Sequence, residues 1–240
     1  LLVAAVGIAR VATERDKIAR RWLTDDDVRQ LVYRDIAAAL RATQPAGEII
    51  LLASPNASMG IGSHGQFKTL GTLFWENAAG LKAAARILCA RTEAEAAALV
   101  RAHGVTHLAF VPGTLFHDEY FQLLHPGVPA TGVRETFGHR LVAAVESAPR
   151  WLQPVPYRWR GDLDFIARGV RLFQVVPDQT ETEQLYHTAL AELARDDVAA
   201  AERTIGRALA ITPATQQAGL CEVAGAAFYD YGADAAAVRL

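Results

Sequence analysis

The sequence predicts an α/β protein with a small, mostly parallel sheet, flanking helices and a helical extension at the C-terminus. Three observations support this fold class. Apolar runs of strand length alternate with helix-period segments up to about residue 176. A helix, a glycine and a strand follow one another across residues 93–111, as in an α/β unit. From Thr180 onward the pattern is wholly helical.

We expect three parts: an N-terminal helical segment over residues 1–44, an α/β domain over 45–177 and tetratricopeptide-like helices over 178–240. The chain begins with nine apolar residues, followed by a basic stretch up to Arg21. Nine residues are too few to span a bilayer, which needs about 20. They fit either the end of a transmembrane helix or the start of a buried one. Thr24, before three aspartates, predicts the N-cap of a further helix.

The first predicted strand is the apolar run at residues 48–53, which is bounded by turn residues and is expected to be buried on both faces. Residues 54–65 are small, polar and glycine-rich, and they predict a loop at the strand's carboxyl end, where ligands bind in open α/β sheets. Residues 60–65 spell GxGxxG, but they begin well after the strand and no acidic residue follows at the required spacing. A phosphate or dinucleotide loop is therefore not expected, and a turn or a packed helix start is the alternative.

The rest of the α/β domain continues the alternation. Residues 70–75 predict a second strand, and Asn77 predicts the cap of a helix that runs to about Cys89. Thr92 caps the helix at 93–102, and the strand at 105–111 is expected to lie parallel to the first. Two helices, a proline-stiffened edge segment and a last strand are predicted over residues 117–124, 132–147, 151–160 and 170–176.

The candidate ligand-binding residues are polar and aromatic side chains of the 54–65 loop and of the junction after the second strand: Asn56, Ser58, Ser63, His64, Trp75, Glu76 and Asn77. No catalytic residue is assigned. Glu76 has no second catalytic group at a suitable spacing, and the serines near His64 lack a GxSxG elbow.

Other chemistries are not expected from this sequence. Five of the seven histidines fall between residues 103 and 139, but there is no HExxH, and His103 and His107 lie on different predicted elements. We therefore expect no metal and no other cofactor. The net charge of -2 provides no field for nucleic acid. Cys89 and Cys221 are expected to be free thiols, although a disulfide between them stays open.

The C-terminal part shows the spacing of a tetratricopeptide helix pair. Small, large and proline positions of such a pair are filled by Ala189, Ala201, Ile205, Ala208 and Pro213. The turn-plus-alanine pattern returns after about 34 residues, which is the period of these repeats.

Taken together, the order of these segments resembles the soluble C-terminal module of bacterial polytopic membrane glycosyltransferase-like proteins, of the oligosaccharyltransferase and protein-mannosyltransferase class. The resemblance covers roughly residues 1–177. It includes Trp75-Glu76-Asn77, the segment from Gly104 to Phe110 and the strand Leu172-Phe173-Gln174-Val175. That family's catalytic carboxylates lie on loops between transmembrane helices, so the resemblance implies none here.

The resemblance implies an accessory, non-catalytic domain at the cell membrane, on the extracytoplasmic (periplasmic) side. Its partners would be the rest of a polytopic membrane protein and a protein or saccharide ligand, such as an acceptor or a lipid-linked sugar donor. Two alternatives remain open. One is a self-contained α/β enzyme with a site at the 54–65 loop, Trp75 and Glu76. The other is a tetratricopeptide protein-interaction module.

Overall fold

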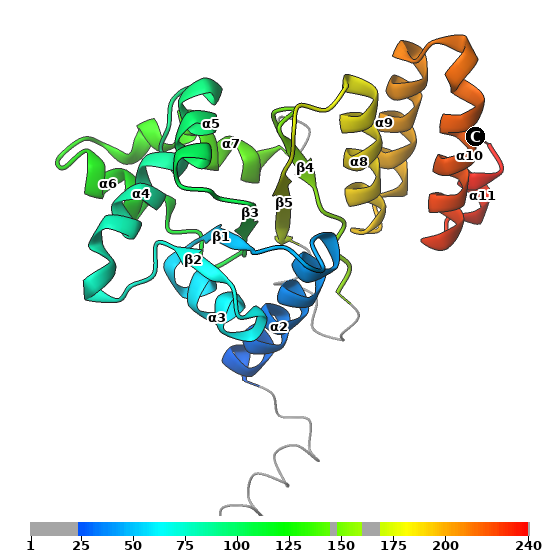
Figure 1. Cartoon of the computed structure of the whole chain (residues 1–240). Coiled ribbons are helices and arrows are strands. Elements are labelled where there is room, and N and C mark those ends of the chain that lie inside the picture. The colour runs from blue at the N-terminus through cyan, green and yellow to red at the C-terminus, as the bar shows by residue number, and fades with distance from the viewer. Residues whose placement is uncertain (1–23, 145–147, 160–168, 240) are drawn as a thin grey trace, which may run out of the picture.

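The computed structural model describes residues 24–144, 148–159 and 169–239. Its centre is a five-stranded sheet in the order β2-β1-β3-β5-β4 (Figure 1). The strands are β1 Ile50–Ala53, β2 Lys68–Leu70, β3 His107–Phe110, β4 Leu152–Pro154 and β5 Arg171–Val175. β1 is parallel to β2 and β3, whereas β5 is antiparallel to both β3 and β4. The α/β class with C-terminal helices is therefore confirmed, and the sheet is mixed.

The parallel pairing of β1 and β3 also confirms the orientation expected for the strand at 105–111. Leu52 of β1 lies opposite Leu108 of β3. The antiparallel pairs sit at the other end of the sheet, where β4 with Pro154 forms the edge, as the sequence predicts. The apolar residues 1–9 and the basic stretch after them lie outside the described residues, as does most of the predicted 1–44 segment.

Two helices cover one face of the sheet: α2 (Asp25–Thr43) and α3 (Pro55–Gly65). α2 begins at the predicted cap, because the Thr24 side chain accepts from the Asp27 backbone and the Asp27 side chain accepts from the Thr24 backbone. The buried side chains of this face include Val32, Ile36, Leu40, Leu51, Ile61 and Leu172.

The prediction of a loop at residues 54–65 is wrong, because these residues form α3. Glycine is a weak helix former, so local propensity argues against a helix here. Packing explains Gly60 and Gly62 instead. A Cβ on Gly60 would lie 2.1 Å from Cδ2 of Tyr33, and one on Gly62 would lie 2.5 Å from Cγ2 of Thr69. α3 thus approaches its neighbours closely at positions that only glycine allows.

The other face is covered by helices that follow β2 and β3. These are α4 (Ala78–Leu88), α5 (Glu93–Ala102), α6 (His117–Leu124), the 3₁₀ helix η2 (Ala130–Glu135) and α7 (Phe137–Ala143). Their shared core includes Leu88, Val100, Leu108, Tyr120, Phe121 and Phe173. Phe137 stacks on Trp151 at 5.7 Å between ring centroids. This face therefore buries large aromatic rings as well as alanines.

Two predicted elements on this side differ from the structure. The second strand ends at Leu70 instead of residue 75, because Gly71 turns the chain with φ +85° and the 3₁₀ helix η1 (Trp75–Asn77) follows. The helix predicted at 132–147 divides into η2 and α7, since Thr136 is extended between them.

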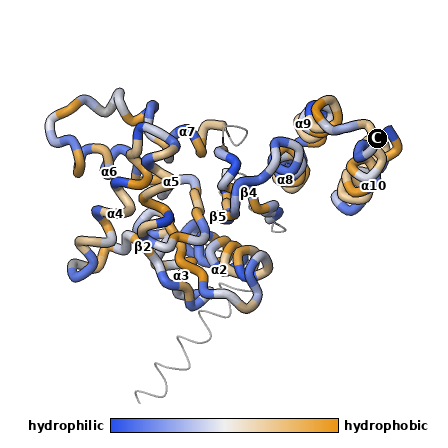
Figure 2. Tube along the Cα trace, turned by 45° about the horizontal axis from the view of Figure 1, so that its top comes forward, coloured by the Kyte–Doolittle hydropathy of each residue, from blue (hydrophilic) through white to orange (hydrophobic). Residues whose placement is uncertain are grey.

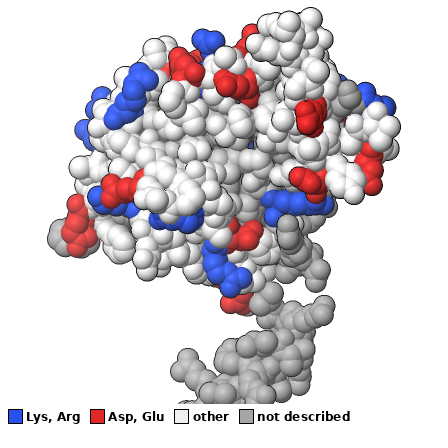
Figure 3. All heavy atoms as spheres, turned by 45° about the vertical axis from the view of Figure 1, so that its right-hand side comes forward, with Lys and Arg blue, Asp and Glu red and all other residues white. Residues whose placement is uncertain are grey.

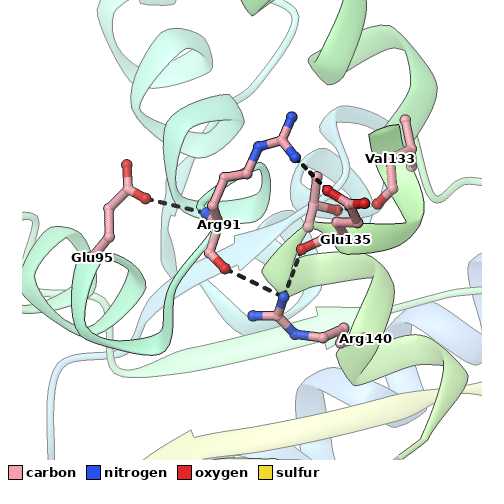
Figure 4. Close-up of polar contacts among 6 residues, drawn as sticks. Arg91, Glu95, Val133, Glu135 and Arg140 are labelled. Atoms are coloured by element: carbon pink, nitrogen blue, oxygen red, sulfur yellow. Dashed lines mark hydrogen bonds and ion pairs between the residues drawn. The ribbon is translucent and has the colours of Figure 1, made fainter. Parts of the chain in front are cut away.

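A polar network joins the turn between α4 and α5 to the segment from η2 to α7 (Figure 4). Arg91 donates to the Glu135 carboxylate at 2.6 Å, and Arg140 donates to the backbone carbonyls of Arg91 and Glu135. The Glu95 carboxylate accepts from the Arg91 backbone. The side chains are exposed, so the network orients these segments more than it stabilises them.

The C-terminal helices form a third apolar cluster beside the sheet (Figure 2). They are α8 (Glu181–Leu193), α9 (Val198–Ile211), α10 (Ala214–Asp230) and α11 (Asp234–Ala237). α8 begins with a capping box at Thr180 and lies against β4. Cys89 and Cys221 are both free. Among the described helices, none has the length and apolar character needed to cross a bilayer.

Candidate functional site

An open groove of about 740 Å³ runs along α3, between α2 and the chain that leaves β2. It lies on the side of the sheet that α2 and α3 cover, and it extends along β2, because Phe67 precedes that strand, Thr69 lies within it and Thr72 follows it. The volume is in the range of small-molecule sites.

α2 contributes one wall of the groove through Asp26, Arg29, Gln30 and Tyr33. Arg29 forms an ion pair with Asp26 at 3.1 Å, one helical turn away. The Gln30 amide oxygen lies 3.3 Å from Nε2 of His64 on α3. This wall therefore presents a carboxylate, a guanidinium and an amide close together, with their charges balanced.

Tyr33 lies at the base of that wall and is 2% exposed. Burial raises the pKa of its hydroxyl, while the charge of Arg29 and the nearby Thr114 hydroxyl lower it. Thr114 does not reach hydrogen-bonding geometry, so the buried hydroxyl has no partner among the described residues. The Tyr33 ring lies directly beside Gly60, where an added Cβ would overlap it.

α3 contributes the second wall through Asn56, Ser58, Met59 and Ser63. Ser58 is fully buried, and its hydroxyl donates toward the carbonyl oxygens of Ala53, at 3.2 Å, and Leu70, at 3.4 Å. These two carbonyls end β1 and β2, so Ser58 ties the helix to the strands. Its hydroxyl is engaged with the backbone and is not presented as a nucleophile.

The structure places the sequence-predicted site residues in two groups. Asn56, Ser58 and Ser63 line the groove, and His64 lies beside it through Gln30. In the second group, around η1, Glu76 and Asn77 do not line it. Glu76 is exposed, whereas an enzyme that used it as an acid or base with a shifted pKa would bury it.

Asn77 of this second group takes a different role from the predicted cap. It precedes α4 but makes no side-chain cap bond, and its amide instead donates to the Thr72 hydroxyl at 2.8 Å. The Trp75 side chain lies outside what the structure describes. Sequence reasoning missed the α2 wall altogether. The signal that could have found it is the polar series at 26, 29, 30 and 33, which share one helical face.

Two buried histidines on opposite faces of the sheet have contrasting surroundings. Nε2 of His107 lies 2.9 Å from the Thr43 hydroxyl, and Nδ1 lies 2.9 Å from the Thr106 hydroxyl. Burial lowers the pKa of His107 to about 4, and the charge of Arg41 adds to this effect. With both nitrogens engaged and the ring neutral at physiological pH, His107 is a structural residue.

His117 lies on the other face, at the start of α6, beside a cavity of about 630 Å³. Its ring packs edge-on against Phe110 and lies 6.3 Å from the ring of His139. Burial lowers its pKa to about 4, and His139 adds to this effect. Nε2 of His117 has no hydrogen-bond partner within the described residues.

Figure 3 shows acidic and basic side chains interspersed over the face in view. Within the described residues, no three His, Cys, Asp or Glu side chains gather in a way that could hold a metal ion.

Comparisons with known proteins find a likeness to solved structures. No protein family and no curated protein matches the chain. The crystal structure of the C-terminal globular domain of an oligosaccharyltransferase from Archaeoglobus fulgidus is similar to 64% of this chain and is itself covered to 98%, with 14% identity and a TM-score of 0.47. A likeness at this level carries no argument about function.

Proposed function

We propose that this chain is a non-catalytic accessory domain of a membrane glycosyltransferase-like protein, placed on the extracytoplasmic side. In this proposal the α2–α3 groove binds a polar ligand, either an acceptor or a lipid-linked sugar donor. The proposal starts from the order of the sequence segments, including Trp75-Glu76-Asn77 and Gly104 to Phe110.

The observation that carries the binding role is the composition of the groove. Amide, carboxylate, guanidinium and hydroxyl groups share it with Met59, Phe67 and Phe74. Such a mixture offers hydrogen bonds to a ligand's polar groups and apolar surface to its carbon skeleton. The Ser58 hydroxyl donates to the Ala53 carbonyl, and Nε2 of His64 lies near Gln30, so the histidine does not activate the serine. This arrangement favours ligand binding over nucleophilic catalysis.

Two experiments test this proposal. The first reads the gene upstream of the Leu1 codon, where we expect many apolar segments long enough to span a bilayer. An upstream region that encodes none would contradict the membrane-protein part of the proposal, whatever the groove binds.

The second experiment measures saturation-transfer NMR with a short-chain polyprenyl-phosphate sugar and with the free monosaccharide. We expect binding that weakens about fivefold in Gln30→Ala and in Asn56→Ala, since each loses one hydrogen bond. Gln216→Ala, at an exposed position on α10, is the matched control. Equal binding by all variants would place the saccharide elsewhere.

A second candidate function, a tetratricopeptide-like protein-interaction module, is favoured by one observation. The predicted close-packing positions Ala189, Ala201 and Ile205 are buried together in the cluster of α8 to α11. Small residues at these positions let paired helices approach closely. The test is whether a variant that ends near Pro177 folds and keeps the binding of the full chain; loss of protein binding alone would favour the interaction module.

A further inference from the structure

The open edge of the sheet lies at β2, directly beside the groove (Figure 1). In the described part of the chain, β2 pairs only with β1. The Lys68 amide donates to the Ile49 carbonyl, so residues 68 and 70 direct their backbone groups toward β1. Because these groups alternate in direction along a parallel strand, the N–H and C=O of Thr69 point away from the sheet.

The surroundings of Thr69 would suit an added strand. Its side chain lies on the α3 face, where Cγ2 approaches Gly62, and the groove extends along Phe67, Thr69 and Thr72. Beyond the end of β2, Leu73 and Phe74 are 50% and 59% exposed. A strand laid along β2 would alternate side chains between the polar groove and the opposite side of the sheet.

We propose that the β2 edge and the groove together bind an extended polypeptide segment, which adds to the sheet as a further strand. The unpaired backbone donor and acceptor of Thr69 are complementary to another peptide backbone. The charged pair in the groove, Asp26 with Arg29, is internally balanced, so the segment needs no net charge. The inference deepens the proposed function by naming a polypeptide as the occupant of the groove, and its test needs only this chain.

The experiment selects binders from a library of acetylated hexapeptide amides with the intact chain, then measures the best peptide by fluorescence anisotropy. Thr69→Pro removes the outward N–H without touching the bonds to β1, and proline is tolerated at such edge positions. We expect about tenfold weaker binding to Thr69→Pro and unchanged binding to Thr69→Val, which keeps the N–H. Salt should have little effect.

A reciprocal measurement keeps the test decisive if Thr69→Pro fails to fold. Each backbone N–H of the peptide is methylated in turn and assayed with the unaltered chain. We expect a period of two, with alternate positions sensitive to methylation. A library without any binder below about 1 mM, equal tolerance of all methylations, or unchanged affinity in a folded Thr69→Pro variant would each overturn the proposal. None of these results bears on the saccharide measurement or on the gene upstream.

Discussion

The two faces of the sheet are packed by different means. On the α2–α3 face, glycines at 60 and 62 let a helix approach Tyr33 and Thr69 closely, and the groove remains open beside them. On the α4–α7 face, aromatic rings of Tyr120, Phe121 and Phe173 fill the space between helices and strands. The difference teaches that a close helix approach through glycines leaves room for a groove on one face, whereas large aromatic rings fill the interior of the other.

The largest expected effect is a loss of stability when a ring is removed from the core of the α4–α7 face. Phe173→Ala removes a fully buried ring from the α4–α7 face and should lower the free energy of unfolding by about 4 kcal/mol. Leu172→Ala, its neighbour on the α2–α3 face, removes fewer atoms and should cost about 3 kcal/mol. Urea unfolding measures both. A larger loss of unfolding free energy in Leu172→Ala than in Phe173→Ala would contradict the view that large rings dominate the packing of the α4–α7 face.

The next effect is the pH dependence of stability that the two buried histidines, His107 and His117, produce. Their pKa values of about 4 lie below the ordinary 6.5, so the unfolded state binds more protons between these values. Stability should be full above pH 6.5 and should fall by about 3 kcal/mol per histidine as the pH drops from 6.5 through 4. NMR titration of the imidazoles checks this. A pKa near 6.5 for His117, with no change in His107, would show that the α4–α7 face admits water.

A smaller effect concerns the glycines of α3. Gly60→Ala should lower the free energy of unfolding by about 1 to 2 kcal/mol, because its overlap with Tyr33 outweighs the gain in helix propensity. Gly206→Ala on α9 is the matched control, since nothing lies within 4 Å of its added Cβ. It should raise stability by about 0.5 to 1 kcal/mol. Thermal unfolding of the pair distinguishes packing from propensity, and a stabilised Gly60→Ala would contradict the close approach.

The smallest effect concerns the polar network on the α4–α7 side. Arg91→Ala should change the free energy of unfolding by less than about 1 kcal/mol, because its ion pair with Glu135 is exposed. Hydrogen exchange in the turn before α5 should stay nearly unchanged, since the bonds of the Arg91 backbone to Glu95 and Arg140 remain in this variant. A loss as large as that of Phe173→Ala would mean that polar contacts hold this face together.

Much of the fold follows from local signals in the sequence. The capping residues Thr24, Thr92 and Thr180 mark helix starts that the structure places at the following residue. α5 and α6 have the predicted bounds. α3 could not be predicted in this way, because its helical state depends on contacts with Tyr33 and Thr69 that are distant in sequence.

In the candidate site, too, some residues could be predicted from the sequence and others could not. Asn56, Ser58 and Ser63 were predictable from their place after a buried strand. The facing residues Asp26, Arg29 and Gln30 were not, because an amphipathic helix ordinarily presents such a polar face to water. Only the tertiary fold turns that face toward another helix.

The placement of α8 against β4 has a consequence for how copies of this chain could assemble. Because α8 lies against the edge strand β4, a second copy that pairs edge to edge with this sheet would use the opposite edge strand, β2. Two copies that met at β2 would each use the edge that the other needs, so the association would close as a symmetric dimer. A fibre requires two usable edges in every copy, and this arrangement of helix and strand works against such growth.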